Sequence, residues 1–240
     1  TGLGDAMSRP SVRAMMAVRI NSLVKGHSGV HPEVLEQLLN FLNNDIIPHV
    51  PRIGSLGASG DLAPLSHMAL SLLGEGMVLD EQNKPIPTQE ALVQHGLIGI
   101  KLRAKDGLSL INGTSQMLAF MTLAERRLSA LLPLADLILC TSMEARKASI
   151  KPSDQRVHDA RPQPGQGLVA RRIRNMMEHS LIVDSHSECQ RVQDAYSFRC
   201  APQVHGAVLQ RYNAMVETLE IELNSATDNP LIFPDPKNPG

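Results

Sequence analysis

A glycine-rich stretch that contains Gly54, Gly57 and Gly60 restricts the fold of this chain more than any other feature. Glycine adopts backbone dihedrals that are closed to other residues, so this spacing predicts a sharply bent loop. The small side chains of Ala58 and Ser59 would let the nitrogen of Gly60 approach the carbonyl carbon of Ala58. Ring closure and loss of the Ser59 hydroxyl as water would then leave an exocyclic methylidene, an electrophile that no ordinary side chain provides.

Simpler interpretations of this stretch remain open on the sequence alone. A glycine-rich segment before a helix is most often an ordinary turn. A phosphate-binding loop is disfavoured because no Gly-Lys-Ser/Thr follows. A hydrolase nucleophile elbow requires glycine two residues after the serine, where this chain has Asp61.

The composition favours a helical protein that acts on a small molecule. Four Phe and two Tyr are the only aromatic residues among 240, so the core must consist of Leu, Ile, Val, Met and Ala, which favours helix. A net charge of -1 gives no electrostatic reason to expect nucleic acid or a membrane as a partner. Three cysteines without Cys-x-x-Cys spacing, with no secretory signal, predict a cytoplasmic protein.

The spacing of apolar residues predicts a series of helices. They cover residues 10–25, 32–47, 62–73, 88–95, 117–132, 168–178 and 204–219. We expect the apolar run after Pro133 to form a further helix that packs back antiparallel. Short extended pieces are predicted at residues 77–79, 85–87 and 108–111, and a surface excursion at residues 151–167. The predicted fold is mainly α, a bundle of long antiparallel helices with a small extended subregion and no internal domain boundary over residues 1–240.

Four motifs together resemble the aromatic amino acid ammonia-lyases, and the histidine ammonia-lyase type most closely. They are residues 54–65, residues 112–114, residues 191–204 and residues 227–231, in family order and with family-like spacing. The resemblance implies that Ala58-Ser59-Gly60 cyclises to 4-methylideneimidazol-5-one (MIO), without an external cofactor. It also implies elimination of ammonia from an aromatic L-amino acid, with histidine, which would give urocanate, as the first candidate.

The resemblance assigns roles to three further polar residues. Asp61 resembles an aspartate implicated in formation of the cofactor, and a helix cap is the alternative role. Asn112 resembles the asparagine beside the cofactor, and an ordinary Asn-Gly turn is its alternative. Arg199 resembles the arginine that binds the substrate carboxylate, a task that suits a planar fork of donors.

Three more site residues follow from the same resemblance. Tyr196 resembles a tyrosine near the cofactor, and Gln193 resembles a hydrogen-bonding partner. If this segment is helical, residues 193, 196 and 199 share one face. Asn229 is assigned to substrate binding, although Asp-Asn-Pro is also a turn signal. We predict no metal site, because His186 and Cys189 lack a second pair of ligands.

The resemblance also implies a homotetramer whose sites draw residues from several subunits. The family's catalytic tyrosine would lie upstream of Thr1, and other site residues would lie downstream of Gly240. We therefore expect the chain to be a fragment of a catalytic polypeptide, and a separate chain is one source of the remaining residues. Two alternatives remain open: an aminomutase that uses the same electrophile, and a non-catalytic fragment or homologue that serves helical assembly.

Overall fold

The computed structural model describes residues 2–186, 188–235 and 237. The chain divides into two compact units. Unit 1 comprises residues 1–124 and 219–240, and unit 2 comprises residues 125–218. Two long helices, α6 (Ser115–Ala145) and α11 (Ala201–Leu223), contribute residues to both units. The predominance of helix over short strands confirms the predicted fold class.

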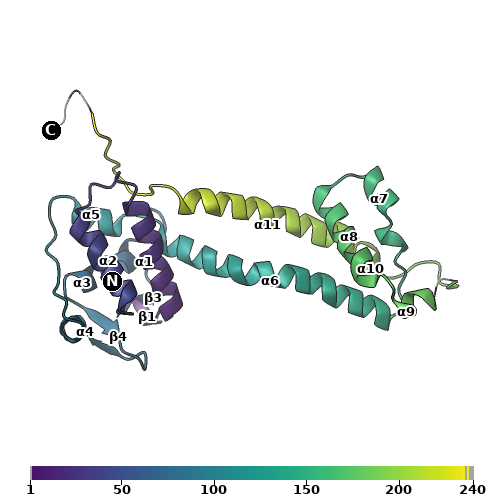
Figure 1. Cartoon of the computed structure of the whole chain (residues 1–240), viewed down its shortest axis with the longest axis horizontal. Coiled ribbons are helices and arrows are strands. Elements are labelled where there is room, and N and C mark those ends of the chain that lie inside the picture. Colours follow the sequence, from purple (N-terminus) through teal and green to yellow (C-terminus); the bar gives the residue numbers. More distant parts are fainter. Residues whose placement is uncertain (1, 187, 236, 238–240) are drawn as a thin grey trace. The chain divides into compact units, whose positions relative to one another are not determined.

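Unit 1 combines helices with short strands, and these elements lie together in Figure 1. Its complete helices are α1 (Arg9–Leu23), α2 (Pro32–Asn43), α3 (Leu62–Leu72), α4 (Thr88–Gln94) and α5 (Asp106–Ile111). Its strands are β1 (Leu3–Ala6), β2 (Ile47–Pro48), β3 (Pro51–Ile53), β4 (Met77–Leu79) and β5 (Pro85–Pro87). β1 pairs antiparallel with β3, whereas β2, β4 and β5 form an antiparallel sheet in that order.

Helix α1 is favoured both by the local sequence at its start and by burial of one face in the core of unit 1. Ser8 is the N-cap residue, and its side chain accepts a hydrogen bond from the backbone nitrogen of Ser11, while a proline occupies the first turn. The buried face of α1 then packs in an aliphatic and methionine-rich core. Members of this core on α1 and α2 include Val12, Met15, Met16, Leu23, Leu38 and Phe41. Apart from Phe41, the buried members of this core are of the residue types predicted from the scarcity of aromatic residues.

Unit 2 begins within α6 and ends within α11, and helices make up most of the chain between them. The intervening elements are the 3-10 turn η1 (Lys151–Ser153), α7 (Gln155–Ala160), α8 (Pro164–Met177), α9 (Leu181–Asp184) and α10 (Tyr196–Arg199). Within this unit, α8 and α10 lie near α11 in Figure 1. Its own core contains Leu139, Met143, Val169, Ile173, Met177 and Leu209.

The prediction that a helix ends at Pro133 is wrong, because α6 continues through this residue to Ala145. Proline removes one backbone donor and crowds the carbonyl four residues earlier, which usually ends a helix. Here the apolar spacing continues on both sides of the proline, and Leu132, Leu139 and Met143 all pack in the core of unit 2. Burial of this face therefore outweighs the local cost, and no second helix packs back on the first at this point.

One further prediction is wrong in detail. Residues 108–111 are helical rather than extended, because they belong to α5, whose first residue Asp106 accepts hydrogen bonds from the backbone nitrogens of His31 and Arg103, each at 2.8 Å. Residues 151–167 are mostly exposed, as predicted for a surface excursion, and they hold η1, α7 and the start of α8. Asp154 caps α7, and Pro164 occupies the first turn of α8, where proline is favourable.

Candidate functional site

The glycine-rich loop between β3 and α3 is sharply bent, as predicted. Gly57 and Gly60 have φ angles of +73° and +86°, a backbone region that L side chains rarely adopt. Backbone bridges join both Gly57 and Ala58 to Gly60, so the chain doubles back on itself within this short span. Ala58 and Ser59 are exposed at the tip of the loop. The structure thus presents the predicted reactive tripeptide on the surface of unit 1.

Gly60 lies directly against the Asn112-Gly113 turn. A Cβ atom added at Gly60 would lie 2.5 Å from the carbonyl oxygen of Gly113 and 2.9 Å from its nitrogen. The same oxygen accepts a hydrogen bond of 2.7 Å from the backbone nitrogen of Asp61. No side chain fits at position 60, and two motifs that are distant in the sequence meet here backbone to backbone.

Hydrogen bonds of the Asp61 side chain connect the loop to the start of α6. Its buried carboxylate accepts from the Ser55 hydroxyl at 2.7 Å, and from the backbone nitrogens of Gln116 and Met117 at 2.8 and 3.0 Å. A carboxylate is favoured at a helix N-terminus because it satisfies unpaired N–H groups and complements the helix dipole. Asp61 occupies the N-cap position of α3, but among the described residues its side chain makes no capping bond there. The predicted cap therefore serves α6 rather than α3.

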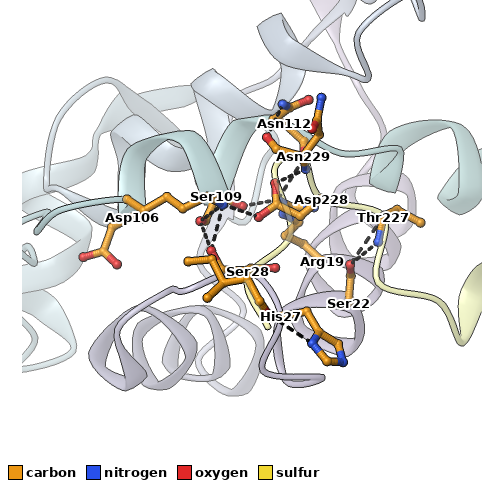
Figure 2. Close-up of polar contacts among 12 residues, drawn as sticks. Arg19, Ser22, His27, Ser28, Asp106, Ser109, Asn112, Thr227, Asp228 and Asn229 are labelled. Carbon is orange, nitrogen blue, oxygen red and sulfur yellow. Dashed lines mark hydrogen bonds and ion pairs between the residues drawn. The ribbon is translucent and has the colours of Figure 1, made fainter. Parts of the chain in front are cut away.

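Asn112 and Asn229 lie next to each other, as Figure 2 shows. The side-chain amide of Asn112 donates a hydrogen bond of 2.7 Å to the carbonyl oxygen of Asn229. The backbone nitrogen of Asn229 in turn donates to the Asp228 carboxylate at 2.8 Å. Of the residues predicted for the site, unit 1 therefore brings together Gly60, Asp61, Asn112 and Asn229.

A buried charged cluster behind the Asn112-Gly113 turn was missed by sequence reasoning. It consists of Arg19, Lys105 and Asp228, and the side chain of Asp228 is fully buried between the two cations. The sequence did carry a signal for it. Arg19 lies four residues after Met15 and four before Leu23, so it occupies the core face of α1, where an unpaired charge would be costly.

The other predicted residues, Gln193, Tyr196 and Arg199, meet in unit 2. Arg199 Nη1 donates to Gln193 Oε1 at 2.8 Å, and the guanidinium carbon lies 4.9 Å from the centre of the Tyr196 ring. The condition for a shared helical face is not met, because α10 covers only Tyr196–Arg199 and Gln193 precedes it in irregular backbone. The cation–π contact and the hydrogen bond bring the three side chains together without a shared helical face.

Arg199 and Gln193 line a cavity of about 460 Å³ in unit 2, together with Lys147, Lys151 and Arg191. Asp194 also lines this cavity. A hydrogen bond from the backbone nitrogen of Ser149 and an ion pair with Arg191 hold the pKa of Asp194 below its ordinary value. Four cationic side chains thus face this cavity against Asp184 and Asp194, and this excess of positive charge suits an anionic ligand such as a carboxylate. Among the described residues, no group of three or more His, Cys, Asp or Glu side chains could hold a metal ion.

A bent Ala58-Ser59-Gly60 loop, with an asparagine turn beneath it and an arginine beside a tyrosine, is the combination of motifs that the family resemblance rests on. The chain belongs to the aromatic amino acid lyase family, whose pattern matches residues 1–239. Histidine ammonia-lyase from Myxococcus xanthus is 45% identical over 234 residues, which are 98% of this chain and 46% of that protein.

Solved structures show the same relationship. Histidine ammonia-lyase from Trypanosoma cruzi is 39% identical with a TM-score of 0.88, and the match covers 99% of this chain and 44% of that one. A tyrosine aminomutase from Streptomyces globisporus is 40% identical with a TM-score of 0.86, over 97% of this chain and 47% of that one. These matches confirm the predicted family and helical fold. The chain spans about half the length of the relatives it matches.

Proposed function

We propose that this chain belongs to an enzyme that eliminates ammonia from an aromatic L-amino acid, and that the amino acid is histidine. The observation that carries the proposal is the contact of Gly60 with Gly113, which leaves no room for a side chain beside the exposed Ser59. An ordinary turn has no need of such a close backbone approach. The choice of histidine is supported by the relative from Myxococcus xanthus, which is named for that substrate.

The loop fits the MIO group that the family implies. The bridge between Ala58 and Gly60 and the left-handed φ of Gly60 bring the ends of the tripeptide toward each other. Asp61 and Ser55 hold the flanks of the loop through their mutual hydrogen bond. When formed, MIO would supply an electrophilic methylidene to the substrate. Ala58, Ser59 and Gly60 would provide all its atoms, and Asp61 would hold them in place.

The chain's other residues would bind and orient the amino acid. Arg199 would bind the carboxylate through two parallel charge-assisted hydrogen bonds, and the Tyr196 ring and Gln193 hold its guanidinium in position. Asn112 would present its amide oxygen to the amine, because its amide nitrogen is engaged by the Asn229 carbonyl. Asn229 would thus act by orienting Asn112. These assignments leave the group that removes the proton to another part of the assembly.

The mass of the intact protein and the identity of its product test this proposal together. We expect the chain to be lighter than its encoded mass by two waters, and the complete enzyme, which includes the group that removes the proton, to convert histidine to urocanate and ammonia. A sequence identity of 40% to a tyrosine aminomutase makes a β-amino acid the specific competing product. A β-amino acid would assign the chain to the mutases. The full encoded mass in a well-folded sample would support the non-catalytic alternative.

Replacement of Arg199 by glutamine should raise KM for the amino acid by about 10- to 100-fold, because hydrogen bonds to a charged group contribute about 1.5–3 kcal/mol. The effect on kcat should be smaller, because the carboxylate lies away from the bond that breaks. Steady-state kinetics would measure both constants. Arg171→Gln, at an exposed position of α8, is the matched control and should change neither. An unchanged KM in Arg199→Gln would remove Arg199 from the substrate site.

We further propose that α6 serves assembly into a homotetramer. Within unit 2 this helix exposes large apolar side chains, which are Leu131, Leu134, Leu137 and Ile138. By length and composition alone, the run Asp106–Ala145 could also cross a membrane. Glu125, Arg126 and Arg127 lie within this run, and charges are costly in a bilayer, so a protein partner suits the exposed face better. The three free cysteines support the predicted cytoplasmic location.

A further inference from the structure

Arg19 is a charged residue in the centre of an apolar core. Its side chain is 0% exposed and stands on the buried face of α1 with Met15 and Met16. Burial lowers the pKa of the Arg19 guanidinium to about 10, and Asp228 opposes this shift. An apolar residue of similar size would fill such a position at lower cost, so a buried charge here calls for an explanation in terms of what it contacts.

The guanidinium contacts the end of α5 and the turn that follows it. Arg19 Nη2 donates to the carbonyl oxygen of Ser109, and to that of Asn112 at 3.3 Å. Carbonyl groups at the end of a helix lack partners within the helix, and Arg19 supplies one. Arg19 Nη1 lies directly under Gly113, where an added Cβ atom would be only 2.0 Å away.

Gly113 connects the Arg19 guanidinium to the reactive loop, because its backbone contacts both. On its other side, its carbonyl oxygen accepts from Asp61 and its backbone touches Gly60. The order in space is therefore the Arg19 guanidinium, then the Asn112-Gly113 turn, then the reactive loop. A displacement of the guanidinium would move the surface on which Gly60 rests.

Asp228 completes the arrangement, as Figure 2 shows. Its carboxylate lies 3.9 Å from Arg19 Nη2 and 2.9 Å from Lys105 Nζ. It also accepts from the backbone nitrogen of Asn229, whose carbonyl oxygen holds the Asn112 amide. A single buried carboxylate thus pairs with two cations and fixes the residue that orients Asn112.

We propose that Arg19 and Asp228 are positioning residues that hold the Asn112-Gly113 turn beneath the Ala58-Ser59-Gly60 loop so that the loop can close into its ring. This inference rests on the proposed function. Closure joins the Gly60 nitrogen to the Ala58 carbonyl carbon. One water takes the Ala58 oxygen and the amide hydrogens of Ser59 and Gly60, and a second takes the Ser59 hydroxyl and its α hydrogen.

The test compares Arg19→Met with the unaltered protein by two measurements that do not depend on turnover. Intact mass followed over time gives the rate at which the two waters are lost, and hydrogen exchange gives the protection of the Asp61 amide. We expect Arg19→Met to slow the loss of water by about 100-fold, the scale expected for a misplacement of about 1 Å in a reacting geometry. The Asp61 amide should exchange faster, because its acceptor on Gly113 is no longer held.

Asp228→Asn should have a larger effect than Arg19→Met, because it leaves the buried Arg19 and the partly buried Lys105 without a carboxylate. The double variant should lose water faster than the product of the two single effects predicts, because the uncompensated charge of one change is removed by the other. Arg19→Lys retains the charge but loses the fork of donors, and should fall between Arg19→Met and the unaltered protein.

Leu38→Ala is the matched control for general loss of stability. It opens a cavity in the core of unit 1 on α2, and should lower the unfolding temperature while the rate of water loss stays unchanged. If Arg19→Met does not fold, Arg19→Lys decides the question by the same two measurements. Unchanged water loss and unchanged Asp61 exchange in these variants would overturn the inference.

The proposed function and the inference fail in different ways. An unaltered protein that keeps its full encoded mass would contradict the proposed function. In that case faster exchange of the Asp61 amide in Arg19→Met but not in Leu38→Ala would still support the positioning role. Equal exchange in all three proteins would reject it.

Discussion

Replacement of Ser59 by alanine should lower turnover by more than about 10³-fold, the scale of loss when a residue with an irreplaceable chemical role is removed. The Ser59 hydroxyl is the group whose departure would create the methylidene, and alanine has no such leaving group. Because Ser59 is exposed, the free energy of unfolding should change by less than about 0.5 kcal/mol. Steady-state kinetics and thermal unfolding would check the two expectations.

Ser66→Ala is the matched control, since Ser66 lies nearby on α3, where its hydroxyl donates to the carbonyl oxygen of Leu62 at 2.7 Å. It should retain both turnover and the loss of two waters. Ser59→Ala should lose at most one water, because only ring closure remains available to it. Near-normal turnover by Ser59→Ala would refute the proposed electrophile.

Replacement of Gly60 by alanine should both destabilise unit 1 and prevent ring closure. The φ of +86° strains any L side chain, and the new Cβ would lie 2.5 Å from the Gly113 carbonyl oxygen, which is backbone and cannot rotate away. Strain and overpacking together should lower the free energy of unfolding by about 2–5 kcal/mol. Intact mass should show the full encoded weight, and denaturant unfolding would measure the loss of stability.

Gly26→Ala separates the two causes. Gly26 has a φ of +80°, but a Cβ atom there would meet no described atom within 4 Å. This variant should therefore cost only the backbone strain, about 1–2 kcal/mol, and should still lose two waters. If Gly60→Ala loses two waters as readily as Gly26→Ala, the close contact with Gly113 is not required for cyclisation.

Local sequence signals predicted the helix starts well, because each rests on short-range chemistry. Ser8 caps α1 and a proline begins α2, and both can be recognised within one turn of helix. The course of the chain at Pro133 could not be predicted in the same way. Whether a proline ends a helix depends on how much apolar surface the next turns bury, which is a property of the folded unit.

The parts of the candidate site that lie within short sequence motifs could be predicted. The bend at Gly60 and the grouping of Arg199 with Gln193 and Tyr196 are present in the structure. The partners of Asp61 were not predictable, because the helix that it caps begins more than fifty residues later. Arg19 was missed although its spacing puts it on the core face of α1, because its partner Asp228 lies more than two hundred residues away in the sequence.

The return of the chain to α1 after α11 has a consequence for folding. The backbone nitrogen of Thr227 donates to the Ser22 hydroxyl, and that of Ile232 donates to the carbonyl oxygen of His27. Unit 2 is therefore an insertion within unit 1. Helix α1 carries the buried Arg19 and emerges from the ribosome long before Asp228, whose carboxylate pairs with that arginine. The apolar core of unit 1 lies within residues 7–119 and precedes unit 2 in the chain, so the buried Arg19 stays without its carboxylate until the residues after unit 2 have been synthesised.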